Sequence, residues 1–140
     1  MRIIIPVFLL ILSIGCNSTK KISKEPGYLN GTWQPVQQEM GGVPLPMTVF
    51  EKQKLIISDS LYTVIAESID KGVVMKKDNK MDIYGREGVN AGRHFTAIYK
   101  YENKQLAICY NLKGDSYPES FETKGKPMYF LSVFKKEFSK

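Results

Sequence analysis

Cysteine, histidine and tryptophan are scarce in this chain of 140 residues, which contains two cysteines, one histidine and one tryptophan. Two cysteines leave almost nothing for a disulfide framework or a cysteine-rich zinc site, and one histidine gives little basis for a histidine-dependent triad. We therefore expect no catalytic residues, no metal site and no cofactor. At 43% hydrophobic and 24% charged residues, the composition is that of one globular domain rather than a disordered chain.

Long hydrophobic runs are also lacking, except at the N-terminus. Residues 3–14 are aliphatic or aromatic apart from Pro6 and Ser13, and they follow one positive charge at Arg2. A membrane-spanning helix needs about 20 apolar residues, so this run is too short to be one. The charge, the apolar run and the small residues after it predict a secretory signal peptide over residues 1–15.

Cys16 stands where this hydrophobic run stops. The order Leu12-Ser13-Ile14-Gly15-Cys16 resembles a bacterial lipobox, although Ile14 is a less usual residue before the glycine. The resemblance implies cleavage before Cys16 and acylation of its sulfur with fatty chains such as palmitate, so that Cys16 is the membrane anchor. Two or more such chains hold a protein firmly to a bilayer. An ordinary signal peptide followed by an incidental cysteine is the alternative.

The polar residues 16–27 are expected to form a flexible tether. Asn17, with no acidic cluster after it, resembles lipoproteins on the periplasmic face of the outer membrane. Lipidation of Cys16 would leave Cys109 as the single thiol and so exclude an intrachain disulfide. Cys109 lies in an apolar run and is expected to be a buried, unreactive residue.

Beyond residue 28 the chain lacks a sustained helical period, whereas short runs of β-branched and aromatic residues recur between turn residues. The predicted fold is all-β, a small antiparallel β-barrel over residues 28–138. Turns are expected at 58–60 and 102–104, and a loop without ladder pairing at 39–46 because of its prolines. The strands are predicted at residues 32–38, 54–58, 62–67, 73–77, 81–84, 95–101, 105–111, 120–123 and 128–135.

The predicted strand 95–101 shows which side chains face the interior. Its odd positions Phe95, Tyr99 and Tyr101 are aromatic, whereas its even positions are more polar, so we expect the odd face to be inside and the even face largely wet. Residues 128–134 are apolar on both faces, which predicts a strand covered on both sides by a loop, a helix or a partner protein.

Several segments, taken in order, resemble a family of bacterial lipocalin-like domains found in secreted proteins and lipoproteins. Leu29-x-Gly31-x-Trp33 includes the Gly-x-Trp of the lipocalin superfamily, in which the tryptophan caps the barrel floor. Tyr117 stands where the family has arginine, and lysine replaces its terminal arginine. The resemblance implies a lipocalin-like barrel but no particular activity. The further matching segments are Gly42 with Leu45-Pro46, Phe50-Glu51, Met81-Asp82-Ile83, Ile98-Tyr99, Leu106-x-x-Cys109 and Pro118-x-x-Phe121.

Other motifs give little support to catalysis or to nucleic-acid binding. His94 is interpreted as a surface or strand-edge residue, because no nucleophile at motif spacing and no orienting carboxylate can be identified. The net charge of +6 supports only weak attraction to anionic surfaces, since an envelope domain seldom meets nucleic acid.

The sequence therefore predicts a non-enzymatic envelope lipoprotein that binds a small apolar or amphipathic ligand through the barrel mouth. The candidate ligand-binding residues are Trp33, Phe95, Tyr99 and Tyr101. The alternative is a tethered interaction module, in which residues 128–134 or 41–47 dock an envelope protein. An enzymatic function is a third hypothesis, but no residues supply a nucleophile and a base at a recognisable spacing.

Overall fold

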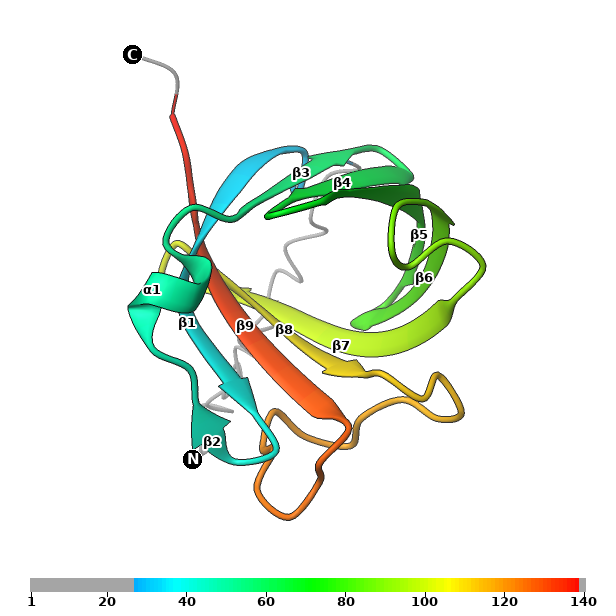
Figure 1. Cartoon of the computed structure of the whole chain (residues 1–140). Coiled ribbons are helices and arrows are strands. Elements are labelled where there is room, and N and C mark those ends of the chain that lie inside the picture. Colours follow the sequence, from blue (N-terminus) through cyan, green and yellow to red (C-terminus); the bar gives the residue numbers. More distant parts are fainter. Residues whose placement is uncertain (1–26, 139–140) are drawn as a thin grey trace, which may run out of the picture.

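A computed structural model describes residues 27–138 of the chain. The predicted signal peptide, Cys16 and most of the tether lie outside these described residues. Eight antiparallel strands form a closed barrel (Figure 1), which confirms the predicted lipocalin-like fold class. They are β1 (Gly31–Met40), β3 (Lys54–Ser58), β4 (Leu61–Ile65), β5 (Ile69–Lys77), β6 (Lys80–Glu87), β7 (His94–Glu102), β8 (Gln105–Asn111) and β9 (Tyr129–Lys136).

The barrel closes because the first and last strands pair with each other. The β1–β9 register runs from Trp33 opposite Lys136 to Met40 opposite Phe130, with an irregularity between Pro35 and Gln37. Six neighbouring pairs of the ring, from β3–β4 to β8–β9, join strands that are consecutive in the sequence, whereas residues 41–53 connect β1 to β3 and residues 112–128 connect β8 to β9. The predicted turns at 58–60 and 102–104 are confirmed: Asp59 has φ of 54° and Asn103 has φ of 51°, a conformation that these residue types tolerate.

One end of the barrel is packed around Trp33, which is fully buried. The indole Nε1 donates a hydrogen bond of 2.8 Å to the carbonyl of Leu29, and the ring meets Tyr101 edge-on at 5.9 Å. Gly31 has φ of +134°, and a Cβ there would lie 2.6 Å from Cε of Lys136, whose ammonium sits 5.4 Å from the indole ring. The glycine therefore makes room for the lysine that covers the tryptophan.

The predicted inward face of β7 is confirmed, because Phe95, Ala97 and Tyr99 are buried in the core. The expectation that the opposite face is wet is wrong. Thr96 and Ile98 are only 4% and 5% exposed, although alternation along the strand turns them outward.

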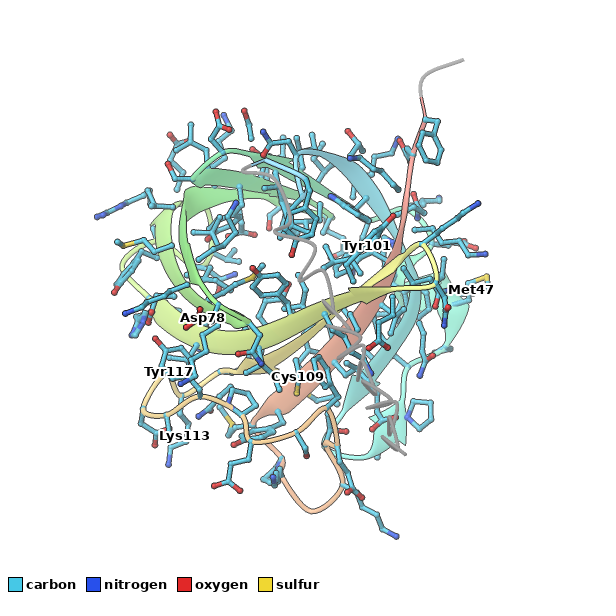
Figure 2. All side chains as sticks on the ribbon, turned by 180° about the vertical axis from the view of Figure 1, so that it is seen from behind. Met47, Asp78, Tyr101, Cys109, Lys113 and Tyr117 are labelled. Carbon is cyan, nitrogen blue, oxygen red and sulfur yellow. The ribbon has the colours of Figure 1, made fainter. Side chains whose placement is uncertain are left out.

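Residues 112–128 account for this burial, since they cross the outside of the barrel (Figures 1 and 2). Thr96 Oγ1 donates to the carbonyl of Ser116, and the ammonium of Lys100 lies 4.7 Å from the ring of Phe121. Cys109, which pairs with Ile98, is fully buried on the same outer face. The domain thus has a second apolar layer outside the barrel wall.

Two further predictions about local structure are wrong. Residues 120–123 form no strand, because the hydroxyl of Thr123 bonds to Glu39 and to the amide of Gly42 instead of the segment joining a ladder. Residues 39–46 do pair, through β2 (Val43–Pro44), which lies against the end of β1. Pro44 is tolerated there because β2 is an edge strand, where a missing N–H breaks no ladder.

The short helix α1 (Met47–Phe50) follows β2 and lies outside the barrel beside β1 (Figure 1). Its Phe50 is buried, while Met47 and Val49 are exposed. Within residues 27–138, no helix has the length and apolar character needed to cross a membrane.

Candidate ligand-binding cavity

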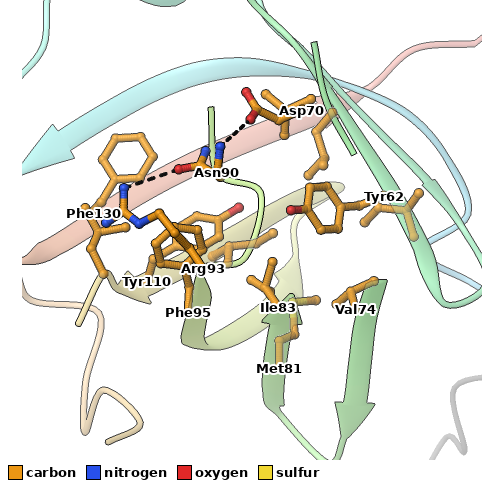
Figure 3. A pocket seen from close by; sticks show the side chains of 15 residues that line it. Tyr62, Asp70, Val74, Met81, Ile83, Asn90, Arg93, Phe95, Tyr110 and Phe130 are labelled. Carbon is orange, nitrogen blue, oxygen red and sulfur yellow. Dashed lines mark hydrogen bonds between the residues drawn. The ribbon is translucent and has the colours of Figure 1, made fainter. Parts of the chain in front are cut away.

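The barrel encloses a cavity of about 310 Å³ (Figure 3), and Trp33 is not among the residues that line it. This volume lies at the lower end of the range of about 300–1,000 Å³ that is usual for small-molecule sites. Alternating inward positions of seven barrel strands supply most of the lining, which is predominantly aliphatic and aromatic. The lining residues are Leu55, Ile57, Tyr62, Val64, Asp70, Val74, Met81, Ile83, Asn90, Arg93, Phe95, Ile108, Tyr110, Leu112 and Phe130.

Three polar residues cluster at the mouth of the cavity, where the β6–β7 loop folds over the barrel. The backbone N–H of Asn90 donates to Asp70 Oδ1 at 2.9 Å, and Arg93 Nη1 donates to Asn90 Oδ1 at 3.4 Å (Figure 3). Asp70 is buried at 6% exposure, and its Oδ2 accepts a second hydrogen bond, from the hydroxyl of Ser68. Arg93 is exposed and also lines the cavity, so the cavity meets solvent beside its guanidinium.

Two tyrosines point their hydroxyls toward one another across the cavity (Figure 3). Burial, together with the charge of Asp70, raises the pKa of Tyr62. Burial, with smaller effects of Tyr62 and Cys109, raises the pKa of Tyr110 strongly. Both side chains are therefore neutral at physiological pH, and each offers an O–H donor to a guest in the cavity.

The four predicted ligand-binding residues are divided between the two ends of the barrel. Phe95 lines the cavity, beneath the guanidinium of Arg93 at 4.9 Å from its ring. Trp33 and Tyr101 pack together at the closed end, and Tyr99 donates its hydroxyl hydrogen bond to the carbonyl of Asp78 at 2.9 Å. None of these three belongs to the cavity lining described above.

Sequence reasoning missed the polar residues at the mouth and the two facing tyrosines. Tyr62 and Tyr110 lie in predicted strands, and alternation from Phe95 through the hairpin pairing places Tyr110 on the inner face, so this signal was present. Asn90 and Arg93 had no such signal, because they lie in the loop between β6 and β7, outside any alternating pattern.

A second polar cluster lies on the outer wall and changes the interpretation of His94. An orienting carboxylate does exist: His94 Nε2 is 2.8 Å from Asp82 Oδ1, and Tyr117 donates its hydroxyl to Asp82 Oδ2 at 2.5 Å. Tyr84 stacks on the imidazole at 4.6 Å. Burial opposes ionisation of Asp82, but the bonds from Tyr117 and His94 and the charge of His94 outweigh it, so the pKa of Asp82 is lowered.

This cluster fastens residues 112–128 to the barrel, because Asp82 is on β6, His94 is on β7 and Tyr117 is in the covering segment. Both carboxylate oxygens of Asp82 accept these hydrogen bonds, so the cluster joins β6, β7 and residues 112–128. Throughout the described part of the chain, no group of three or more His, Cys, Asp or Glu side chains is placed to hold a metal ion.

Cys109 is buried and forms no disulfide within residues 27–138, and burial raises its pKa to about 11. The nearby charge of Lys126 lowers the pKa and that of Glu39 raises it, but both effects are smaller than that of burial. The predicted burial of this thiol is confirmed.

Comparison of the chain with protein-family models, with curated proteins and with solved structures found no match.

Proposed function

We propose that this protein is a non-enzymatic lipoprotein of the bacterial envelope that binds a small apolar or amphipathic ligand inside its barrel. The cavity carries this proposal. It is apolar over most of its lining, holds about 310 Å³ and reaches solvent beside Arg93. Removing apolar surface from water is the main favourable contribution to binding in such a site.

The packing of the other end supports one direction of entry. Trp33 and Leu29 are at most 1% exposed, and Tyr101 packs on the indole ring. In contrast, Asn90, Tyr110 and Phe130 around the cavity are partly exposed. A ligand therefore enters at the mouth formed by the β6–β7 loop, the C-terminal end of β8 and the N-terminal end of β9.

The lipid anchor and the family are part of the same proposal. Cys16 in its lipobox-like context would attach the domain to a membrane, on the periplasmic face of the outer membrane, through the tether that ends at residue 27. A tethered barrel with an open cavity would hold its ligand close to the membrane surface. The closed barrel and the buried Trp33 of the Gly31-x-Trp33 motif are compatible with the lipocalin-like family that the sequence resembles.

Native mass spectrometry and dye displacement test the ligand-binding function. The chain carrying Cys16→Ser, which has no lipid of its own, is expected to bind one neutral fluorescent dye per molecule. Val74→Phe fills the cavity from a position that is 4% exposed, and is expected to weaken dye binding at least about tenfold. Val43→Phe, at a position 63% exposed and outside the cavity, is the matched control. No dye binding, or equal binding by both phenylalanine variants, would contradict the proposal.

A second function, docking of an envelope protein, is favoured by one observation. Val43, Met47 and Val49 are 63%, 63% and 51% exposed and follow one another along β2 and α1. Such a cluster of exposed apolar side chains is typical of interaction sites. Val43→Ser combined with Met47→Ser is expected to abolish crosslinking to a stoichiometric partner in membranes without affecting dye binding. Crosslinking that survives both changes would contradict this function.

A further inference from the structure

Arg93 is the only cationic side chain that lines the cavity, among residues 27–138. Its guanidinium lies 4.9 Å from the ring of Phe95 and makes one long hydrogen bond to Asn90. Each ion pair found in the described residues joins other groups, so Arg93 has no carboxylate partner there. A guanidinium has five N–H donors, and most of those of Arg93 remain available to a guest.

The cavity is electrically asymmetric. Asp70 lies at the Tyr62 side, where its two oxygens already accept hydrogen bonds from Asn90 and Ser68. Asn90 stands between the two charges, since its backbone N–H donates to Asp70 and its side-chain oxygen accepts from Arg93 (Figure 3). A negative group in the cavity is therefore repelled from the Tyr62 side and attracted to the Arg93 side.

Tyr110 adds a neutral donor to this arrangement. It lines the same cavity as Arg93, and its raised pKa keeps the hydroxyl protonated at physiological pH. No hydrogen bond to another described residue engages this hydroxyl, which points into the cavity (Figure 3). This neutral donor faces Tyr62, so Arg93 supplies the charged donor of the cavity, while the apolar part of a guest contacts Val74, Met81 and Ile83.

We infer that the ligand is an anionic amphiphile, a medium-chain carboxylate whose head group binds Arg93 and whose alkyl chain fills the barrel. This inference rests on the proposed function and specifies its ligand. One guanidinium with Asp70 nearby suits a single negative charge better than a dianionic phosphate. The cavity volume, at the low end for ligand sites, favours a medium chain over a long one.

The test compares two ligands of equal chain length, decanoate and decanol, by displacement of a neutral dye at pH 7.5. The protein is the chain with Cys16→Ser. Decanoate is expected to bind about tenfold more tightly than decanol, as a charge-assisted hydrogen bond would give. Arg93→Gln is expected to reduce this ratio to about one and to leave the affinity for decanol unchanged.

Arg86→Gln is the matched control, because Arg86 is exposed on β6 near the same loop and lies outside the cavity lining. It is expected to keep the full preference for decanoate, and circular dichroism verifies that both variants are folded.

The outcomes separate this inference from the function on which it rests. If decanol binds as tightly as decanoate, or if Arg93→Gln keeps the preference, the anionic head-group site is refuted while ligand binding stands. If neither compound nor the dye binds, the ligand-binding function itself fails, and this inference fails with it.

Discussion

Replacement of Trp33 by phenylalanine tests whether this residue holds the closed end of the barrel or contributes to the ligand site. The indole Nε1 donates to the carbonyl of Leu29 at 2.8 Å, and both residues are almost completely inaccessible to solvent. Phenylalanine keeps an aromatic ring but has no donor. Trp33→Phe therefore leaves a buried carbonyl without this partner and a small void where the larger ring was.

The magnitude follows from these two losses. A buried acceptor left without its partner costs about 1–3 kcal/mol. The void left by the smaller ring costs about 1 kcal/mol more. The free energy of unfolding is therefore expected to fall by about 2–4 kcal/mol, a large part of the roughly 5–15 kcal/mol that stabilises a typical domain.

Urea unfolding followed by circular dichroism measures this change without needing the single tryptophan as a probe. Phe138→Ala is the control, since that aromatic ring is 83% exposed and its loss is expected to change stability by less than about 0.5 kcal/mol. Ligand binding by the folded Trp33→Phe variant is expected to be unchanged. A variant as stable as the parent would refute the role at the closed end. A folded variant that had lost ligand binding would instead show that Trp33 contributes to the ligand site.

Two other predictions concern the outer layer. Because the folded-state pKa of Asp82 is lowered, its ionised form stabilises the fold above its unfolded pKa of about 3.9, and this stabilisation is lost as the pH falls through the folded pKa. Asp82→Asn is thus expected to lower the urea midpoint of unfolding at pH 7. The midpoints at pH 7 and pH 3 are expected to differ less in this variant than in the parent chain. An equal difference in both proteins would contradict the stabilising role of the Asp82 carboxylate. Cys109, with a pKa of about 11, is expected to resist a thiol reagent at pH 8 in the folded chain with Cys16→Ser and to react at once in urea. Rapid reaction of the folded chain would show that residues 112–128 do not cover this thiol.

The barrel could be predicted because short-range sequence patterns indicate its strands and turns. Alternation in β7 identified the inner positions Phe95 and Tyr99, and turn residues such as Asn103 marked the hairpins. Six of the eight pairs in the ring, from β3–β4 to β8–β9, join consecutive strands, so recognising strands and turns in order specifies most of the topology.

The outer layer, residues 112–128, could not be predicted in this way, because its sequence has no periodic pattern. Residues 112–128 have no regular strand or helix, and they cover Thr96 through a tertiary contact. A polar threonine in an alternating strand suggests a wet face, and only the carbonyl of Ser116 makes its burial favourable. The same tertiary placement brings Tyr117 to Asp82, from 35 positions away in the sequence.

The site shows the same distinction between local pattern and tertiary placement. Aromatic residues suggested a ligand site, but an aromatic ring fills a barrel end as readily as it lines a cavity, and Trp33 and Tyr101 do the former. Polar residues distinguish the open end. Asn90 bonds there to Asp70, which is 20 positions away in the sequence, and to Arg93, which is 3 positions away. For the ligand that we propose, the packed rings at one end of the barrel and the opposite charges at the other favour a single orientation, with the head group at Arg93.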